Sequence, residues 1–330
     1  MTAPLLEVRD LNVWFNSDDG SRVHAVRGVS FTLDAAERAG LVGESGCGKS
    51  TTVLALLGLL PPTAQYSGEV LLNGTDIMAE GEASVQSARW TEIAMVFQGA
   101  MNAFNPVRRV GSQLVEVLRV RAGLGKQAAV DRARELFEMV GIPRDRVRRY
   151  PHEFSGGMRQ RAAIALALAC EPKVLLADEP TTALDVMVQA QIVELLRSLC
   201  EQQGLALLLV SHDLPLIAQV CSNLNVMYAG EIIERGPVAD LYRAPAHPYT
   251  RLLLAATPDI VDISELVSIK GAPPALSRPI TGCPFRPRCD RAFSRCETEA
   301  PVLKTVGENR LAACHLNDKV PSDTPLKVNP

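Results

Sequence analysis

The sequence lacks the features that would carry a chain into or across a membrane. Its first ten residues, MTAPLLEVRD, contain neither a basic segment nor an apolar core of the kind that directs secretion. Its longest apolar runs, such as TVLALLGLL and AAIALALAC, fall well short of the roughly 18 residues that cross a bilayer. We therefore expect a soluble chain that is not exported, so disulfides are not expected either.

A strong charge of one sign is also missing. The 330 residues carry a net charge of −3, with 34 Lys and Arg against 37 Asp and Glu. Nucleic-acid binding needs a concentrated basic face, so this balance argues against a nucleic-acid partner. Apolar residues make up 47% of the chain, enough for the core of one large domain and a smaller one.

Apolar strands alternate with helices through most of the chain. This pattern predicts an α/β fold with a parallel sheet covered on both faces. Strands are expected at 5–15, 24–33, 37–43, 173–178 and 205–213, and helices at 49–60, 111–122, 128–141, 159–170 and 186–204. We predict an α/β domain at 1–258 with a helical subdomain at about 84–165, a cysteine-rich extension at 259–318 and a disordered tail at 319–330.

The stretch GESGCGKS, which begins at Gly43, matches the phosphate-loop pattern G-x-x-x-x-G-K-[ST]. It stands between a predicted strand and a predicted helix, the context this motif requires. Glycines let consecutive N–H groups point at a phosphate, and the helix N-terminus adds positive charge. Lys49 suits the outer phosphates and Ser50 suits Mg²⁺. The predicted ATP-binding residues here are Gly43, Glu44, Ser45, Gly46, Cys47, Gly48, Lys49, Ser50 and Thr51.

Two further polar groups end apolar strands. VLLADEP ends in Asp178 and Glu179, and carboxylates at a buried strand end need a partner. Asp178 suits Mg²⁺, and Glu179 suits polarising the water that attacks the γ-phosphate. His212, in SHD, ends the next strand, where ligands of parallel sheets gather, and it could contact the γ-phosphate.

Six motifs occur in one order along the chain: the phosphate loop, MVFQ, FSGGMRQR, VLLADEP, ALD and SHD. Together they resemble the ATPase subunit of ABC transporters over about residues 5–258. The resemblance implies a P-loop ATPase core with a parallel sheet and flanking helices, an antiparallel β subdomain and a helical subdomain. It also implies roles for further residues. These are Gln98 in a loop that links Mg²⁺ to the transmembrane partner, Ser155, Gly156 and Gly157 in the signature, Asp185 in the D-loop, His212 as the switch histidine, and Phe15, with Trp14 as fallback, on the adenine.

The chain has one phosphate loop and one signature. In the family that it resembles, the two meet on one ATP across a dimer, so this chain would be half of an ATPase pair. SGG before a helix is a second anion-binding N-terminus, in agreement with that arrangement. Two positions depart from the family's usual pattern: Met158 replaces a Gln, and Gly99 follows Gln98 where an acidic or amide residue is common.

FSGGMRQR resembles the D-type subunit of oligopeptide and dipeptide importers, and the C-terminal extension resembles that of peptide and nickel importers. The resemblance implies an F-type ATPase partner, two permease subunits, an extracytoplasmic binding protein, and a peripheral position at the cytoplasmic face of the inner membrane. Nickel or an oligosaccharide is an alternative cargo. A non-transport ABC ATPase is disfavoured, because the chain has neither room for a coiled coil between Gly43 and Ser155 nor a second cassette.

Four cysteines lie in the extension with spacing C-x5-C-x6-C-x17-C. Zinc sites usually contain a closer pair, such as C-x2-C, whereas four thiolates can hold an iron–sulfur cluster. Some peptide-importer ATPases of the resembled family carry a [4Fe–4S] cluster in this extension, so the resemblance favours a cluster at Cys283, Cys289, Cys296 and Cys314. Zinc and unligated thiols stay open. Arg286, Arg288, Arg291 and Arg295 could offset thiolate charge, bind a partner or form a solvated basic face.

Overall fold

The computed structural model describes residues 3–16, 20–79, 81–99, 103–256 and 269–318. The chain divides into two compact units. The first comprises residues 1–7, 32–38 and 70–211, and the second comprises 8–31, 39–69 and 212–330. Each unit therefore combines segments that are far apart in the sequence.

The first unit is built on three parallel strands with β7 between β6 and β8. All five residues of β7 and of β8 are buried, which explains why these stretches are apolar throughout. The bounds in this unit are β5 Thr75–Asp76, α2 Glu82–Ala88, β6 Ile93–Val96, α3 Val110–Val120, α4 Lys126–Met139, α5 Gly156–Ala167, β7 Val174–Asp178, α6 Val186–Gln203 and β8 Ala206–Val210, with 3-10 turns at Arg144–Arg148 and Pro151–Glu153.

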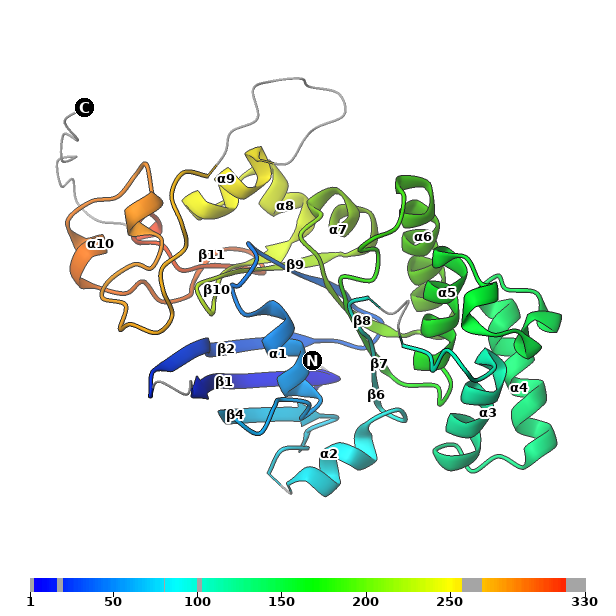
Figure 1. Cartoon of the computed structure of the whole chain (residues 1–330). Coiled ribbons are helices and arrows are strands. Elements are labelled where there is room, and N and C mark those ends of the chain that lie inside the picture. Colours follow the sequence, from blue (N-terminus) through cyan, green and yellow to red (C-terminus); the bar gives the residue numbers. More distant parts are fainter. Residues whose placement is uncertain (1–2, 17–19, 80, 100–102, 257–268, 319–330) are drawn as a thin grey trace. The chain divides into compact units, whose positions relative to one another are not determined.

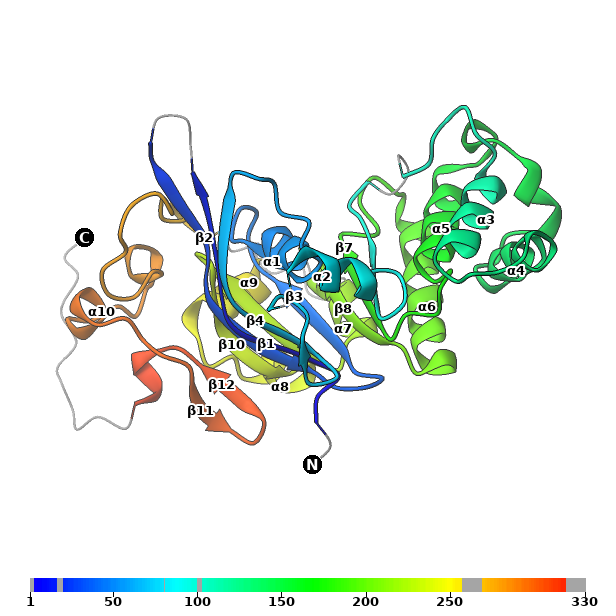
Figure 2. The ribbon, with the colours of Figure 1, turned by 90° about the horizontal axis from the view of Figure 1, so that it is seen from below.

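Helices α3, α4, α5 and α6 lie side by side in this unit (Figures 1 and 2). Helix α3 buries Val110, Gly111, Leu114 and Leu118, a helical spacing that places them on one face. A Cβ at Gly111 would lie 2.3 Å from the carbonyl oxygen of Val147, so only glycine permits this close approach. Helix α6 ends at Gln203, and its C-cap Gly204 has a φ of 63°, which suits glycine.

The second unit contains the strand order β11-β12-β10-β9-β3, in which β3 and β9 are parallel and the other pairs antiparallel. A separate sheet has the order β2-β1-β4. The bounds are β1 Leu6–Asn16, β2 Arg22–Leu33, β3 Arg38–Val42, α1 Lys49–Leu56, β4 Ala64–Leu72, α7 Leu214–Val220, β9 Asn223–Tyr228, β10 Glu231–Pro237, α8 Val238–Arg243, α9 Pro248–Ala255, α10 Arg295–Thr298, β11 Lys304–Gly307 and β12 Arg310–Ala312, with 3-10 turns at Arg286–Arg288 and His315–Asn317.

The cysteine-rich segment 269–318 packs onto the second unit through strands and aromatic rings. Strand β12 pairs with β10, opposing Ala312 to Glu234. Phe285 lies 5.3 Å from Tyr228 and 5.4 Å from Tyr249 between ring centroids, and all three side chains are buried. Edge-to-face packing of this kind stabilises a core beyond its buried area. The segment is thus part of the unit's core.

The predicted strands and helices are present, with small differences at their ends. The helix expected at 49–60 ends at Leu56, because Gly58 adopts a φ of 59° and the chain turns there. Strand β6 lies inside the region predicted as a helical subdomain. The predicted boundary near residue 258 and the predicted tail at 319–330 lie outside the described residues, so those domain limits stay predictions.

Candidate functional site

The phosphate loop joins β3 to α1 within the second unit, as the sequence predicts. Gly43, Gly46 and Gly48 have φ of 154°, 79° and 105°, which favour glycine. A Cβ at Gly43 would lie 2.1 Å from the carbonyl oxygen of Met227, and one at Gly48 would lie 2.5 Å from that of Ala25. Two of the glycines are therefore required by close packing as well as by backbone conformation.

Lys49 lies at the start of α1 and is 7% exposed. Its Nζ donates to the carbonyl oxygens of Gly43, at 2.7 Å, and Glu44, at 3.0 Å. The carbonyl oxygens of the loop thus hold the ammonium group beside the loop, where it could bind a phosphate. Ser50 and Thr51 occupy the next two positions of the helix, in its first turn, where backbone N–H groups and the helix dipole favour an anion.

Cys47 is a packing residue in this loop. Its side chain is buried, and burial raises the pKa of the thiol. A thiol of this kind is a poor nucleophile at neutral pH, since the thiolate is the reactive form. Its side chain therefore packs as a small apolar filler, and its predicted contact with ATP stays a prediction.

Glu44 has contacts that the sequence did not suggest. Its carboxylate accepts two hydrogen bonds from Arg288, at 2.6 and 2.8 Å, and its N–H donates to the hydroxyl of Tyr249 at 2.9 Å. Both partners come from the C-terminal part of the chain. Arg288 falls in the segment whose arginines suggested a charge offset, a partner site or a basic face, and the structure places its side chain on the phosphate loop instead.

Asp178, Glu179 and Gln98 belong to the first unit. Asp178 is the last residue of β7 and is buried, and Glu179 follows it with an unusual φ of 44°. The Gln98 side-chain amide donates to Glu179 at 2.9 Å, and the Thr182 hydroxyl donates to the same oxygen at 3.0 Å. A non-glycine residue in this conformation persists only where its surroundings fix it. The structure thus brings Gln98 and Glu179 together across a sequence separation of 81 residues.

The predicted signature residues form a helix start in the first unit. Ser155 is the N-cap of α5, and its hydroxyl accepts a hydrogen bond from the Met158 N–H at 3.3 Å. Gly156 and Gly157 are the first residues of the helix, as anion binding at an N-terminus requires. Asp185 is the N-cap of α6 and accepts a hydrogen bond from the Val188 N–H at 3.0 Å. Each N-cap side chain satisfies one backbone donor.

Two other predicted residues lie in the second unit. His212 follows β8 and is exposed, directly before the α7 cap residue Asp213. Phe15 is part of β1 and half-buried. Its neighbour Trp14 stacks on His24 at 4.7 Å, with the Arg22 guanidinium 4.5 Å from the indole ring. The predicted contact of Phe15, or of Trp14, with adenine stays a prediction.

The four tail cysteines line one small enclosed cavity together with His247 and Phe285. Burial raises the pKa of Cys283 to about 11 and that of Cys314 to about 12. Four thiols converging on one cavity are the donor set of a four-cysteine cluster. Yet within the described ranges no three His, Cys, Asp or Glu side chains are placed to hold a metal ion. The structure does not bear out the predicted cluster, although it gathers the residues predicted to hold it.

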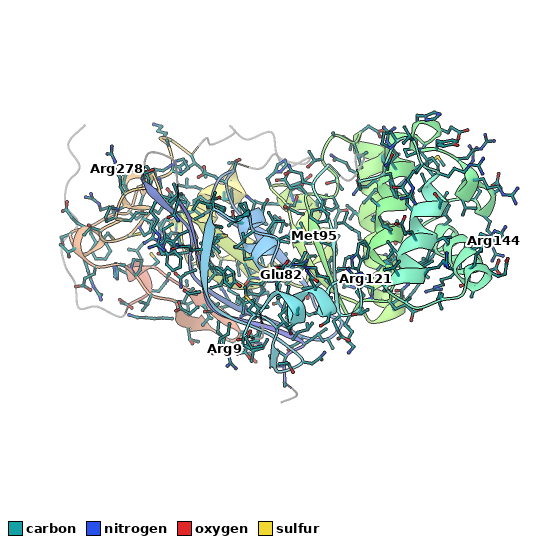
Figure 3. The ribbon with its side chains drawn as sticks, turned by 60° about the horizontal axis from the view of Figure 1, so that its bottom comes forward. Arg9, Glu82, Met95, Arg121, Arg144 and Arg278 are labelled. Atoms are coloured by element: carbon teal, nitrogen blue, oxygen red, sulfur yellow. The ribbon has the colours of Figure 1, made fainter. Side chains whose placement is uncertain are left out.

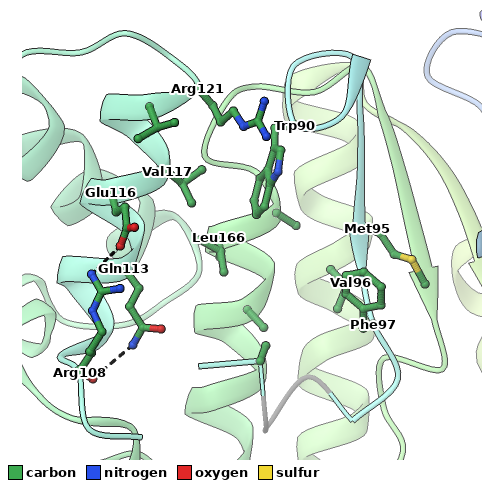
Figure 4. Close-up of a pocket in the computed structure, with 14 residues that line it drawn as sticks. Trp90, Met95, Val96, Phe97, Arg108, Gln113, Glu116, Val117, Arg121 and Leu166 are labelled. Atoms are coloured by element: carbon green, nitrogen blue, oxygen red, sulfur yellow. Dashed lines mark hydrogen bonds and ion pairs between the residues drawn. The ribbon is translucent and has the colours of Figure 1, made fainter. Parts of the chain in front are cut away.

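A groove that the sequence did not suggest lies in the first unit (Figure 4). Its volume is about 520 Å³, and its lining is mostly apolar. Phe97 and Val120, at its walls, are 45% and 72% exposed, which is high for large apolar side chains. Met95 and Arg121, which also line it, are labelled in Figure 3. Phe97 directly precedes Gln98, so the groove adjoins the predicted Mg²⁺-linked loop.

None of the helices that the structure describes is long and apolar enough to span a membrane.

Comparisons with known proteins agree with this architecture. A family model described as ABC transporter matches residues 26–182, and one described as Oligopeptide/dipeptide transporter, C-terminal region matches residues 233–296. The oligopeptide transport ATP-binding protein OppD of Salmonella typhimurium is 46% identical over 313 residues, covering 94% of this chain and 93% of its own. OppD of Bacillus subtilis is 44% identical over 328 residues, covering 97% and 91%.

Solved structures show the same fold. The dimeric structure of MJ0796, a bacterial ABC transporter cassette, matches with a TM-score of 0.63 and 26% identity, covering 71% of this chain and 98% of that one. The same cassette bound to ADP and Pi matches with a TM-score of 0.62 and 26% identity, over the same shares of the two chains.

The phosphate loop, the acidic strand end and the capped signature helix, on this α/β scaffold, define the ATPase cassette of an ABC transporter. The chain belongs to the ABC transporter family, among the ATP-binding subunits of oligopeptide and dipeptide importers. The predicted fold class and ATPase activity are confirmed. The individual site residues stay predictions, as does the [4Fe–4S] cluster.

Proposed function

We propose that this chain binds and hydrolyses ATP to power the import of dipeptides and oligopeptides. The observation that carries the proposal is the presence, on one chain, of the cassette at 26–182 and the oligopeptide-type C-terminal region at 233–296. The relatives named above are oligopeptide transport ATP-binding proteins, and each matches this chain over nearly its whole length. Nickel or an oligosaccharide is the alternative cargo, since a cassette contacts its cargo little and its sequence barely distinguishes them.

ATP binding is assigned to the phosphate loop and to Phe15 on the adenine. Lys49 binds the outer phosphates, and Glu179 orients the attacking water for in-line attack on the γ-phosphate. The hydrogen bond from Gln98 fixes the Glu179 carboxylate, and His212 contacts the γ-phosphate. Mg²⁺, which neutralises charge on the phosphates, would be held by Ser50, Gln98 and Asp178.

A single signature on the chain supports pairing with a second ATPase subunit, here assigned as the F-type. Ser155, Gly156, Gly157 and Asp185 would then complete the ATP site of that partner. A helix start with two glycines is suited to a phosphate, because N–H groups without a partner in the helix and the helix dipole both favour an anion there. The complex would also contain two permease subunits and an extracytoplasmic binding protein, with this chain peripheral at the cytoplasmic face.

The groove beside Phe97 is the proposed permease contact. Exposed apolar side chains with a polar rim of Arg108 and Glu116 have the composition of a protein interface. We expect Val120→Glu to abolish co-purification with the permease subunits while leaving ATP binding by the full chain unchanged. Val107→Glu is the control, because Val107 is exposed but does not line the groove. Equal recovery of permease with both variants would contradict the assignment.

Glu179→Gln tests the hydrolytic role. The amide keeps the shape of the side chain but cannot polarise water as a carboxylate does, so we expect turnover in the assembled importer to fall by about 100-fold or more while ATP still binds. Glu194→Gln is the matched control, an exposed change on α6 that removes only the ion pair with Arg197. Near-normal turnover by Glu179→Gln would exclude this role.

We also retain the predicted [4Fe–4S] cluster at Cys283, Cys289, Cys296 and Cys314 as a proposal. Its support is the convergence of the four thiols on one cavity. A bound cluster would tie together the turns that carry these cysteines. Anaerobic purification with iron, sulfide and zinc analysis tests it: about four irons per chain support it, as a [4Fe–4S] centre requires. Stoichiometric zinc or metal-free thiols would exclude it.

A further inference from the structure

We infer that Arg288, in the cysteine-rich segment, is a positioning residue of the ATP site and acts through Glu44. Its two Nη atoms donate to the two carboxylate oxygens of Glu44 at 2.6 and 2.8 Å. The Arg288 side chain is 4% exposed and that of Glu44 is 25% exposed. A two-point contact between a buried arginine and a carboxylate is stronger and more directional than an ion pair on the surface. The inference rests on the proposed ATP-binding role of the loop.

The surroundings of Arg288 hold its guanidinium in this position. Its Nε donates to the carbonyl oxygen of Lys270 at 3.0 Å, and one Nη donates to that of Ile269 at 3.3 Å. The guanidinium carbon also lies 5.9 Å from the ring centroids of both Tyr228 and Phe285. Carbonyls and ring faces both favour a fixed cation. The position of the Arg288 guanidinium is therefore fixed by contacts other than the one with Glu44.

Arg286, two residues earlier in the same 3-10 turn, provides a contrast. Its side chain is 41% exposed and pairs with Glu297, which is itself 64% exposed. A pair of this kind contributes little, because solvent screens it. The two arginines share a turn and a charge, but only Arg288 contacts the phosphate loop.

Glu44 transmits the contact to the phosphate-binding atoms. Its N–H donates to the Tyr249 hydroxyl, and its carbonyl oxygen accepts a hydrogen bond from Lys49 Nζ at 3.0 Å. Arg288 thus fixes Glu44, which hydrogen-bonds both Tyr249 and the predicted phosphate-binding residue Lys49. Arg288 also neutralises a carboxylate that would otherwise repel the triphosphate from within the loop. Removing it leaves that charge uncompensated.

The test measures MgATP affinity on the full chain and, in the assembled importer, KM and kcat. We expect Arg288→Gln to weaken ATP binding by about 10-fold, a typical loss for an uncompensated charge near a ligand, and to raise KM more than it lowers kcat. Arg286→Gln is the matched control and should bind as the wild type does. Arg288→Lys, which keeps the charge but not the two-point contact, should fall between them.

Glu44→Gln in the Arg288→Gln background tests whether the loss of affinity comes from the Glu44 carboxylate that Arg288 holds and neutralises. If the harm comes from an uncompensated carboxylate, the double variant should recover most of the lost affinity. Thermal unfolding of the same variants detects a folding defect, because a chain that unfolds at the wild-type temperature but binds ATP more weakly has lost affinity and not stability. Equal affinity of Arg288→Gln and Arg286→Gln, or no recovery in the double variant, would overturn the inference. A wild-type chain that does not bind ATP would instead overturn the proposed function itself.

Discussion

Replacing Gly157 by alanine tests how closely the signature helix packs against α6. A Cβ at Gly157 would lie 2.6 Å from Val188 Cγ1, which is 0.8 Å inside the 3.4 Å at which ordinary contact begins. Valine in a helix has one strongly preferred χ1, so its side chain cannot rotate away easily. We expect overpacking to cost about 1–3 kcal/mol. Alanine gains at most about 1 kcal/mol over glycine in a helix, so the variant should be destabilised.

Val188→Ala supplies the matched background, since it removes both methyl groups that the new Cβ would meet. In that background Gly157→Ala should be neutral or stabilising. Denaturant or thermal unfolding of the wild type, both single variants and the double variant gives the interaction energy directly. ATP turnover in the assembled importer adds a second reading: if Gly157 also faces the partner's ATP, turnover stays low after stability returns. An interaction energy near zero would refute the contact.

Three further predictions follow from the geometry. Gly43→Ala should weaken MgATP binding by about 10-fold or more, because its Cβ would stand 2.1 Å from the Met227 carbonyl oxygen and the loop must deform; unchanged affinity in a titration would contradict this. Gly111→Ala should lower stability by about 1–3 kcal/mol in thermal unfolding, yet leave MgATP affinity intact, since α3 is not part of the phosphate loop; a loss of affinity at full stability would contradict it. Burial lowers the pKa of His247 from 6.5 to about 3. As pH falls below 6.5, this histidine therefore takes up a proton in the unfolded chain but not in the folded one, and the free energy of unfolding falls. His247→Asn, which preserves an N-cap acceptor for α9, should remove up to about 1.4 kcal/mol per pH unit of that slope. The exposed His152→Asn is its control and should keep the full slope; equal slopes in the two variants would contradict the assignment.

Local features of the site could be predicted because they follow from chain geometry. A strand, a glycine-rich turn and a helix in succession specify the phosphate loop, and its glycines at 43, 46 and 48 have φ angles that favour glycine. Ser155 and Asp185 are residue types that cap helices, and each does so. The apolar run 173–178 could be recognised as a buried parallel strand for the same reason.

Contacts between distant segments could not be predicted in this way. Arg288 and Glu44 are 244 positions apart, and periodicity carries no information on pairs so far separated. The arginine-rich turn was open to several interpretations because its composition is also that of an exposed face. The groove beside Phe97 was missed since a single exposed apolar residue is unremarkable in sequence, and only folding brings Val120 beside it.

The cysteine-rich segment is tied to the ATPase unit by three kinds of interaction, which act at different points. Strand β12 extends the sheet at β10, and Phe285 joins the core beside Tyr228, so both ties support the fold. Arg288, in contrast, contacts the phosphate loop through its hydrogen bonds to the Glu44 carboxylate. A displacement of the turn at Arg286–Arg288 would therefore act on the phosphate loop through Glu44, whereas β12 is held separately by its pairing with β10.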